Sequence, residues 1–236
     1  MSRSPGEASQ YLADLTTRLI LSFLLLHESR TELGLYDRII LPRLLACAMQ
    51  NQALTPVRQR LGAAASGRVL EIGIGSALNL PFYGPSVSEV VGVDPSPALV
   101  AMARERRSGP AFRFEVIQGA GESLPLEDRS FDTVLTTWSL CSAGNPAQVL
   151  REARRVLRPG GQLLFAEHGR APDASVRWWQ DRLTPAWKRI AGGCHLNRRI
   201  DDLIGAAAFR LDDLQTGYLP GPKPMTFMYE GRARPG

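Results

Sequence analysis

The stretch Val69-Leu70-Glu71-Ile72-Gly73-Ile74-Gly75-Ser76 restricts the fold of this chain more than any other. The residues before Gly73 are apolar enough for a strand that is buried on both faces, as the strands of parallel sheets are. Gly73 and Gly75 then let the backbone turn sharply, and they remove the Cβ atoms that would keep a ligand away. A strand, a glycine turn and a following helix together form a site where a polar cofactor lies against bare backbone.

The position where a third glycine would stand separates two classes of ligand. A dinucleotide fingerprint needs Gly-x-Gly-x-x-Gly, because the pyrophosphate sits on the loop and the last glycine lets the helix pack closely. Here Leu78 takes that position, and Glu71 lies shortly before Gly73. This Glu-x-Gly-x-Gly form resembles motif I of the class I S-adenosylmethionine-dependent methyltransferases. The resemblance implies that Glu71 and the backbone of Gly73 and Gly75 hold the amino-acid end of S-adenosyl-L-methionine; a glycine turn without a ligand is the alternative.

A second apolar strand, expected over 89–94, ends in an acidic residue. Asp94 follows the glycine loop by about 20 residues, which is the spacing of a ribose-binding carboxylate. A carboxylate accepts several hydrogen bonds at once, so Asp94 is expected to bind both ribose hydroxyls. We expect Pro95, directly after Asp94, to contact the cofactor as well.

The stretch 119–126, Gly-Ala-Gly-Glu-Ser-Leu-Pro-Leu, follows a third expected strand at 112–117. It resembles the Gly-Asp-Ala-Glu-x-Leu-Pro-Phe stretch of the same superfamily, whose acidic residue and backbone surround the adenine ring. Ala120 stands where an Asp usually accepts a hydrogen bond from the adenine amino group. The resemblance therefore implies that backbone up to Gly121, or the carboxylate of Glu122, contacts the adenine.

Strands and helices alternate along the rest of the chain, which predicts a parallel, doubly wound α/β sheet. Ligands of such sheets bind beyond the carboxyl ends of the strands, so Thr137, Trp138 and Ser139 are expected to face the cofactor. A core position is the alternative for Trp138. The further elements are expected as a helix at 146–157, a strand at 162–167, helices at 174–193 and 199–208, and strands at 209–217 and 225–232.

His168 and Arg170 follow the fifth expected strand at the same edge of the sheet. The unperturbed pKa of histidine lies near neutrality, so His168 is a candidate general base; a hydrogen-bonded supporting role is the alternative. Cys194 and His195 suggest a nucleophile and a base, but methyl transfer from a sulfonium needs no covalent intermediate, and adjacent residues do not generally face each other. We take His168 and His195 as candidate bases and Arg170 as the cation that steadies a deprotonated acceptor.

At 236 residues the chain fits one large domain with an elaborated end. We expect an N-terminal helical extension over 1–62 that covers the active site, as such helices do in class I methyltransferases, and a cofactor-binding domain over 63–236. Within that domain, 174–198 form a helical lid insertion with three of the four tryptophans. These residues are interpreted either as core packing or as an aromatic lid over an apolar acceptor.

An apolar run lies within residues 11–26, and it is too short to span a bilayer. It lacks the cleavage site of a signal peptide. Two interpretations are open: a helix that packs on the domain or on a second copy of the chain, and an interfacial helix in peripheral contact with a membrane.

The formal net charge of +5 comes almost entirely from arginines spread along the chain. Because no basic block alternates with aromatic residues, no nucleic-acid partner is expected, while attraction to an anionic membrane face stays open. Cys47, Cys141 and Cys194 are odd in number and widely separated. They predict neither a disulfide framework nor a metal site, and they favour the reducing cytoplasm.

Together these motifs and the string Arg155-Val156-Leu157-Arg158-Pro159-Gly160-Gly161 resemble the class I methyltransferases with a type 11 methyltransferase domain. The resemblance implies a Rossmann-like, doubly wound, seven-stranded sheet whose last strand is antiparallel. A narrower pattern is similar to the alkyl thiol S-methyltransferases of animal endoplasmic reticulum and their bacterial relatives. It comprises Leu140-Cys141-Ser142, Glu167-His168, Pro185-Ala186-Trp187 and Gly193-Cys194-x-Leu196-x-Arg198.

The narrower resemblance implies S-methylation of a small thiol. Animal members carry an N-terminal hydrophobic anchor, and the run at 19–26 is shorter, so membrane attachment is not carried over. Phospholipid N-methyltransferases and quinone-precursor methyltransferases share the general motifs and are the alternatives within the enzyme class. A non-catalytic cofactor-binding scaffold is the alternative from another class, and a nicotinamide enzyme is the weakest one. The sequence does not indicate an oligomeric state.

Overall fold

The computed structural model describes residues 34, 36–106 and 112–236. The chain divides into two compact units, Met1–Ile40 and Leu41–Gly236. Of the first unit, the described part includes the short π-helix η1 (Tyr36–Ile40). The apolar run at 11–26, with its two interpretations, lies outside the described residues.

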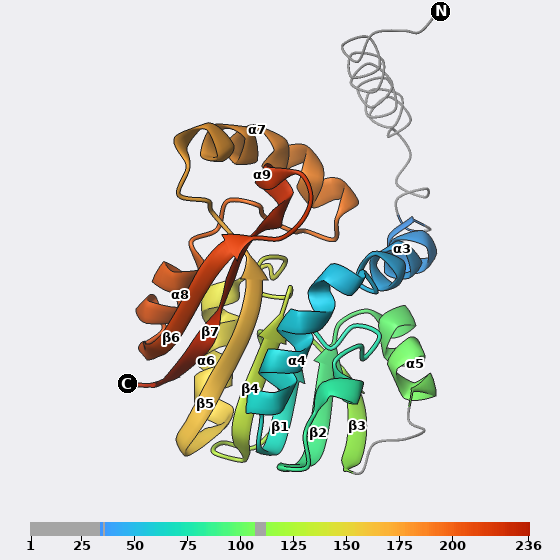
Figure 1. Ribbon diagram of the computed structural model, residues 1–236. Helices are drawn as coiled ribbons and strands as arrows, with labels where there is room; N and C mark the ends of the chain where they lie inside the picture. Colours follow the sequence, from blue (N-terminus) through green and yellow to red (C-terminus); the bar gives the residue numbers. More distant parts are fainter. Residues whose placement is uncertain (1–33, 35, 107–111) are drawn as a thin grey trace, which may run out of the picture. The chain divides into compact units, whose positions relative to one another are not determined.

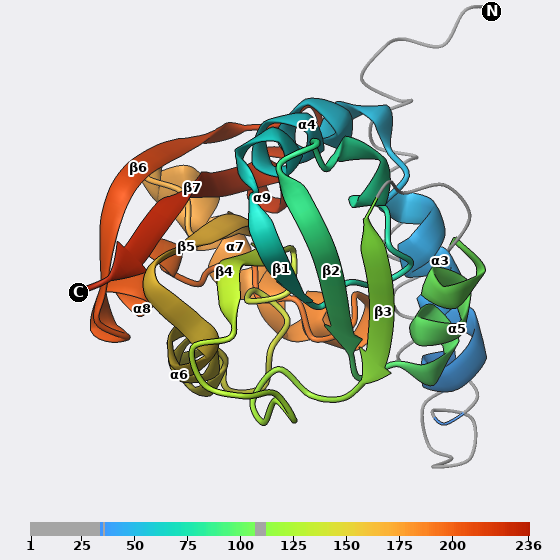
Figure 2. The ribbon, with the colours of Figure 1, turned by 90° about the horizontal axis from the view of Figure 1, so that it is seen from below.

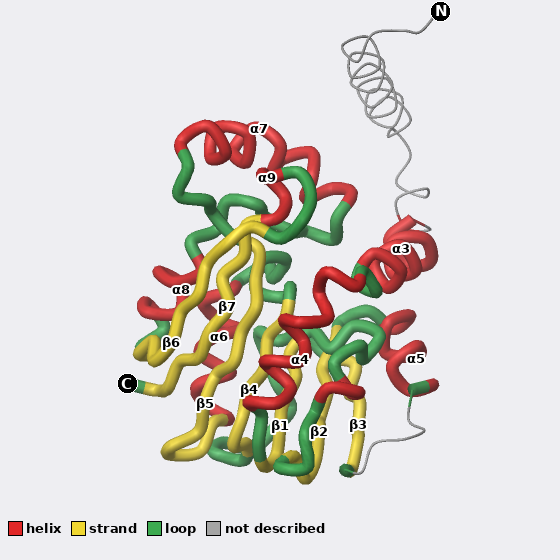
Figure 3. Tube along the Cα trace, viewed as in Figure 1, coloured by secondary structure: helices red, strands yellow, loops and turns green. Residues whose placement is uncertain are grey.

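A seven-stranded sheet in the order β3-β2-β1-β4-β5-β7-β6 forms the centre of the second unit (Figures 1 and 3). Strands β1 to β5 pair in parallel, and β7 runs antiparallel to both β5 and β6. The expected doubly wound sheet with an antiparallel last strand is therefore confirmed. The strands are β1 (Gly67–Ile72), β2 (Val87–Asp94), β3 (Arg113–Gln118), β4 (Phe131–Thr137), β5 (Leu157–His168), β6 (Phe209–Tyr218) and β7 (Phe227–Pro235).

The helices occupy both faces of the sheet, and Figure 2 shows α4 and α6 on opposite faces. They are α3 (Leu41–Ala48), α4 (Thr55–Ala64), α5 (Pro97–Glu105), α6 (Pro146–Val156), α7 (Ala174–Ile190), α8 (Ile200–Ala206) and α9 (Lys223–Thr226), with short 3₁₀ helices η2 (Gln52–Leu54) and η3 (Leu80–Phe82). Neighbouring residues of one strand belong to different core clusters: Val69 packs in the cluster with α4 and α5, and Leu70 packs in the cluster with α6 and α8. Burial on both faces explains why these strands are continuously apolar.

Two local expectations are wrong. The N-terminal helical extension was expected to end at residue 62, but its last helix, α4, continues to Ala64. A Cβ on Gly62 would lie 2.4 Å from the carbonyl oxygen of Phe82, so this glycine allows η3 to pack against α4. The stretch after Gly75 is not an α-helix but a series of turns that leads into η3. Ala77 has a φ of 58°, which interrupts any helix there.

The expected insertion after β5 is the helix α7, which lies with α9 beyond the carboxyl end of β5 (Figure 1). The buried Gln180 anchors it, because its side chain accepts from the Ala171 amide at 2.9 Å and donates to the Gly169 carbonyl at 3.0 Å. Trp178 and Trp179 are 48% and 51% exposed, so they are not core residues. No helix within the described ranges is both long and apolar enough to cross a membrane.

Candidate active site

The glycine loop after β1 leaves space in two different places. Gly73 and Gly75 have φ angles of 73° and 57°, in the left-handed region that favours glycine. A Cβ on Gly73 would lie 2.4 Å from the Cβ of Ser139, so this glycine lets the end of β4 approach the loop. A Cβ on Gly75 would meet no atom of the described residues within 4 Å. The open space that a ligand can use therefore lies at Gly75, whereas the space at Gly73 is filled by Ser139.

Asp94 lies at the end of β2 and is buried. Its two carboxylate oxygens accept hydrogen bonds from the Gly75 amide at 3.0 Å and from the Ser96 amide at 2.9 Å. Burial raises the pKa of Asp94, and the two amide hydrogen bonds oppose that effect. Each oxygen keeps further acceptor capacity, so Asp94 can orient the glycine loop and still bind hydroxyl groups. Pro95 is exposed in the bend that follows.

Glu71 is also buried, and the protein itself uses both of its carboxylate oxygens. Oε1 accepts from Asn79 Nδ2 at 2.5 Å, and Oε2 accepts from the Tyr83 hydroxyl at 2.7 Å. Burial raises the pKa of Glu71 to about 7, against the lowering effect of these hydrogen bonds and of Arg58. Glu71 therefore fixes the segment after the glycine loop. Each of its oxygens keeps further acceptor capacity, so its predicted contact with the amino-acid end of the cofactor stays a prediction.

Arg58 of α4 is a buried cation that sequence reasoning missed. Its guanidinium donates to Asn79 Oδ1 at 2.6 Å and to the Met49 carbonyl at 3.1 Å, and it lies 4.9 Å from the centre of the Trp138 ring. Asn79 Nδ2 also donates to the hydroxyl of Thr137 at 3.0 Å. Arg58, Asn79, Glu71, Tyr83 and Thr137 thus form one buried polar network that joins α4, the glycine loop and the ends of β1 and β4. No motif or spacing marks Arg58, Asn79 or Tyr83, and Arg58 is followed by two further polar residues, so no sequence signal separated this buried cation from its neighbours.

The end of β4 carries backbone strain and unpartnered polar atoms. Trp138 has a φ of 53°, an uncommon conformation for an aromatic residue that is frequent at functional sites. Its ring packs on the core, so part of the core interpretation is correct. The Trp138 indole nitrogen and the hydroxyls of Ser139 and Ser76 are buried and have no hydrogen-bond partner within the part of the chain that the structure describes. Because buried polar groups are normally paired, these atoms fit a polar ligand bound at the glycine loop.

Residues 119–122 are placed by packing and capping. A Cβ on Gly121 would lie 2.7 Å from Cγ2 of Ile72, so this glycine allows close contact with β1. Glu122 accepts from the amide of Asn145, the N-cap of α6, at 3.1 Å. This contact occupies one carboxylate oxygen of Glu122, and Ala120 is exposed. The predicted contact of Gly121 or Glu122 with adenine stays a prediction.

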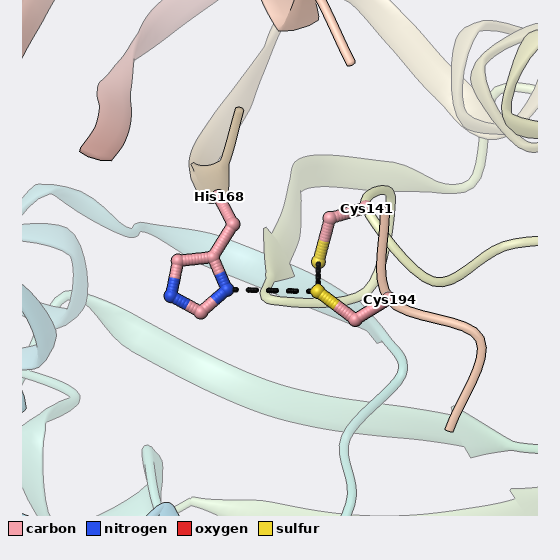
Figure 4. Close-up of side chains that lie close together, drawn as sticks. All are labelled: Cys141, His168 and Cys194. Carbon is pink, nitrogen blue, oxygen red and sulfur yellow. Dashed lines mark hydrogen bonds between the residues drawn. The ribbon is translucent and has the colours of Figure 1, made fainter. Parts of the chain in front are cut away.

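At the carboxyl ends of β4 and β5, two of the three cysteines meet His168 (Figure 4). The sulfurs of Cys141 and Cys194 are 3.7 Å apart, and Cys194 Sγ lies 3.7 Å from His168 Nδ1. Both cysteines are buried, and His168 is half-buried. The contact between the sulfurs raises the pKa of Cys141 and lowers that of Cys194, and Trp187 of α7 further lowers the pKa of Cys194. Cys194 is therefore the partner of His168 and not of its chain neighbour His195, as expected for adjacent residues.

His195 lies next to this cluster. Its backbone amide donates to the Cys141 carbonyl at 2.9 Å, and its ring Nδ1 lies 3.3 Å from the same oxygen. Burial lowers the pKa of His195, with the charges of Arg198 and Lys188 acting in the same direction. His195 is consequently neutral at pH 7 and able to accept a proton, as its prediction as a base requires.

Arg198, and not Arg170, is the cation beside the cysteines. Arg170 forms an ion pair with Asp181 of α7, at 2.8 and 3.1 Å. The half-buried guanidinium of Arg198 donates to the carbonyls of Leu140 and Ala143. Its charge interacts with both cysteines and with Glu167. The expectation that Arg170 steadies a charged acceptor therefore lacks support from its contacts.

Glu167 connects the end of β4 beside the glycine loop with the cluster of Cys141, His168 and Cys194. It is fully buried at the end of β5 and accepts from the amides of Ser139 at 3.2 Å and Cys141 at 3.1 Å. Burial raises its pKa. Because Ser139 contacts the glycine loop, Glu167 fixes the cysteine cluster relative to that loop.

Comparisons with known proteins extend these observations. A family model described as a methyltransferase domain matches residues 70–165. The chain is 36% identical over 178 residues to thiol S-methyltransferase TMT1B of Rattus norvegicus, covering 73% of this chain and 71% of the relative. It is 36% identical over 107 residues to a phosphatidylethanolamine N-methyltransferase of Cereibacter sphaeroides, covering 44% of this chain and 52% of the relative. A SAM-dependent methyltransferase from Thermotoga maritima has the same fold, with a TM-score of 0.61, 21% identity, and coverage of 86% of this chain and 99% of that one.

Proposed function

This chain belongs to the family of the thiol S-methyltransferases, within the S-adenosylmethionine-dependent methyltransferases, and we propose that it methylates the sulfur of a small, apolar thiol. The cofactor is S-adenosylmethionine. The proposal of a thiol acceptor rests on the length of the sequence matches to the relatives. The match to the rat thiol S-methyltransferase covers 178 residues, well beyond the domain at 70–165, whereas the match to the phospholipid enzyme covers 107.

The cofactor half of the site fits S-adenosylmethionine. When bound, the cofactor supplies a methyl group that is activated by the positive charge of its sulfur. The open backbone at Gly75 and the unpartnered hydroxyls of Ser76 and Ser139 would receive its polar amino-acid end, and Asp94 would accept from its ribose hydroxyls. Alignment of the acceptor with the methyl group is worth on the order of several kcal/mol of barrier, so positioning is the main task of the chain.

The acceptor half supplies what a thiol needs. A free thiol has a pKa of about 8.5, so only modest assistance is required to form the reactive thiolate. The neutral ring of His195 can accept the proton, and Arg198 supplies positive charge next to the cysteines. Trp187 of α7 reaches the cluster, which supports a role of this helix as an apolar cover.

The acceptor is tested by incubating the purified chain with methyl-labelled cofactor and a panel of small thiols, phosphatidylethanolamine and polyprenyl phenols. We expect label in the thiol products. Label only in the lipid fraction would overturn the thiol in favour of a lipid acceptor. Tight binding of S-adenosylhomocysteine without turnover of any compound would instead favour the non-catalytic scaffold.

We also propose a cytoplasmic location with peripheral membrane contact through residues 11–26, which rests on the apolar run in that segment. The test is sedimentation of the full chain with anionic vesicles, in comparison with the double variant Leu21→Ser and Leu25→Ser. Equal sedimentation of both proteins would show that residues 11–26 do not contact the membrane.

A further inference from the structure

We propose that Cys141, His168 and Cys194 bind one Zn²⁺ ion and leave its fourth coordination position open to the sulfur of the acceptor. The three side chains come from distant parts of the sequence. Cys141 follows β4, His168 ends β5, and Cys194 follows α7. Their ligand atoms all lie within 4.8 Å of one another.

The separations match a tetrahedral zinc site. Zinc bonds of about 2.3 Å to sulfur and about 2.0–2.1 Å to nitrogen place two sulfurs about 3.8 Å apart and a sulfur and a nitrogen about 3.6 Å apart. The corresponding distances here are 3.7 Å between the two sulfurs and 3.7 Å between Cys194 Sγ and His168 Nδ1. Two edges of the ligand triangle thus already have the required length, and the third, between Cys141 Sγ and the His168 ring, is no longer than 4.8 Å.

The surrounding backbone holds the ligands in place. Glu167 binds the amide of Cys141, and the His195 amide binds its carbonyl, so the backbone of Cys141 is fixed on both sides. Arg198 binds the carbonyls of Leu140 and Ala143 and thereby clamps the same turn. A site prepared in this way needs little rearrangement to bind an ion.

The donor set and the charge favour zinc over a hard cation. Two thiolates and a neutral imidazole are ligands that zinc prefers, whereas magnesium and calcium prefer oxygen. Two thiolates balance the charge of a divalent ion, so a buried site stays neutral. A third thiolate from the acceptor adds one negative charge, and Arg198 lies close enough to offset it. Three protein ligands with one open position are typical of catalytic zinc sites.

The role of the ion rests on the proposed thiol acceptor. When the acceptor takes the open position, its S–H bond breaks, the proton passes to the ring of His195 and from there to water, and the sulfur stays as a thiolate ligand. A lone pair of this sulfur forms the new bond to the methyl carbon. The bond from that carbon to the sulfonium breaks, and its electron pair remains on the sulfur of the departing S-adenosylhomocysteine. The neutral thioether is a poorer ligand than a thiolate and is released.

Metal binding is measured on the full chain with the ions alone. Protein that has been stripped with a chelator is given Zn²⁺ or Co²⁺, desalted and analysed for metal and by absorption spectroscopy. We expect one ion per chain, and with Co²⁺ a thiolate-to-metal charge-transfer band together with the intense visible bands of a tetrahedral site. Loss of the ion on desalting, or an octahedral Co²⁺ spectrum, would overturn the proposal.

Variants test the three ligands. Cys141→Ser, Cys194→Ser and His168→Gln should lose the ion and the charge-transfer band, whereas Cys47→Ser, at the exposed cysteine, should keep both. Binding of S-adenosylhomocysteine by calorimetry verifies that each variant folds. If the buried cysteine variants do not fold, His168→Gln carries the test, because its side chain is half-buried. Full retention of the ion and of the unchanged Co²⁺ spectrum in folded His168→Gln contradicts the site.

Activity separates this proposal from the proposed function. Stripping should lower kcat/KM for thiols about tenfold or more, and Zn²⁺ should restore it. Equal thiol methylation by stripped and loaded protein would keep the thiol acceptor and overturn the role of the ion. A stably bound ion without methylation of any thiol would keep the metal site and overturn the acceptor.

Discussion

The two halves of the active site differ in how their residues are held. In the cofactor half, at the ends of β1 and β2, Glu71 binds Asn79 and Tyr83, and Asp94 binds the amide of Gly75. These contacts are short bonds between oxygen and nitrogen or oxygen, and they join residues from one continuous segment. In the acceptor half, Cys194 Sγ lies 3.7 Å from Cys141 Sγ and 3.7 Å from His168 Nδ1. These three residues come from different regions of the chain.

The difference indicates that the halves have separate tasks. In the cofactor half, short hydrogen bonds of the two carboxylates hold the neighbouring side chains and backbone amides in fixed positions. Such an arrangement suits a single ligand. The acceptor half is soft and polarizable, and its sulfur atoms suit an ion or a thiol. Variants in the first half should therefore remove cofactor binding, and variants in the second should change the use of the acceptor while cofactor binding persists.

The largest effect is expected for Asp94→Ala. The variant removes a charged acceptor from the Gly75 amide and from the ribose, which together are worth about 3–4 kcal/mol, so kcat/KM should fall about 100- to 1,000-fold. Calorimetry with S-adenosylhomocysteine should show a parallel loss of affinity. Asp213→Ala, at an exposed position on β6, is the matched control. If Asp94→Ala kept the wild-type affinity for S-adenosylhomocysteine, the Asp94 carboxylate would have no part in cofactor binding.

The two loop glycines should respond differently to alanine. Gly73→Ala combines a left-handed backbone with a collision against Ser139, so urea denaturation should show a loss of about 2–4 kcal/mol in the free energy of unfolding. Gly75→Ala has only the backbone cost of about 1 kcal/mol, but its methyl group enters the open space. Its affinity for S-adenosylhomocysteine should therefore fall while the fold remains. Tight binding by Gly75→Ala would show that the cofactor does not occupy that space.

Glu71 should make stability depend on pH. Because its pKa is raised from 4.5 to about 7 in the folded protein, the folded state binds a proton more tightly than the unfolded state between these values. Stability should consequently decrease as pH rises through this range, by on the order of 3 kcal/mol from this group, and level off above pH 7. Denaturation at several pH values should show a flatter profile for Glu71→Gln. The same slope in both proteins would refute the assignment to Glu71.

The smallest effects should separate the two arginines of the acceptor half. Arg198→Ala removes the clamp on the Leu140 and Ala143 carbonyls and should lower kcat/KM for the acceptor about tenfold, with S-adenosylhomocysteine affinity retained. Arg170→Ala removes a partly exposed ion pair worth about 0–1 kcal/mol and should change the rate less than about threefold. A larger loss in Arg170→Ala than in Arg198→Ala would restore the role first expected of Arg170.

Much of the cofactor half could be predicted from the sequence, because its residues follow one another in a strand, turn and strand of fixed spacing. Gly75 has the open backbone expected of the loop, Asp94 ends β2, and Thr137 ends β4 at the predicted edge. The network of Arg58, Asn79 and Tyr83 was missed, since an isolated buried cation has no periodicity or motif. Glu71 was singled out as a cofactor contact, which stays a prediction. Both of its oxygens bind the protein, and no spacing rule reveals that.

The sequence by itself determined the alternation of strands and helices and the glycine turn, because apolar patterns and glycine spacing are local properties of the chain. The antiparallel last strand was expected only from the resemblance to the class I methyltransferases. Only the tertiary structure decided that Gly73 makes room for Ser139 and that Cys141, Cys194 and His168 converge. It also decided that Arg198 lies at the turn of Cys141, whereas Arg170 pairs with Asp181. Three widely separated side chains carry no spacing signal for a metal site. They become neighbours because the parallel strands β4 and β5 end side by side and the segment after α7 folds back onto that edge.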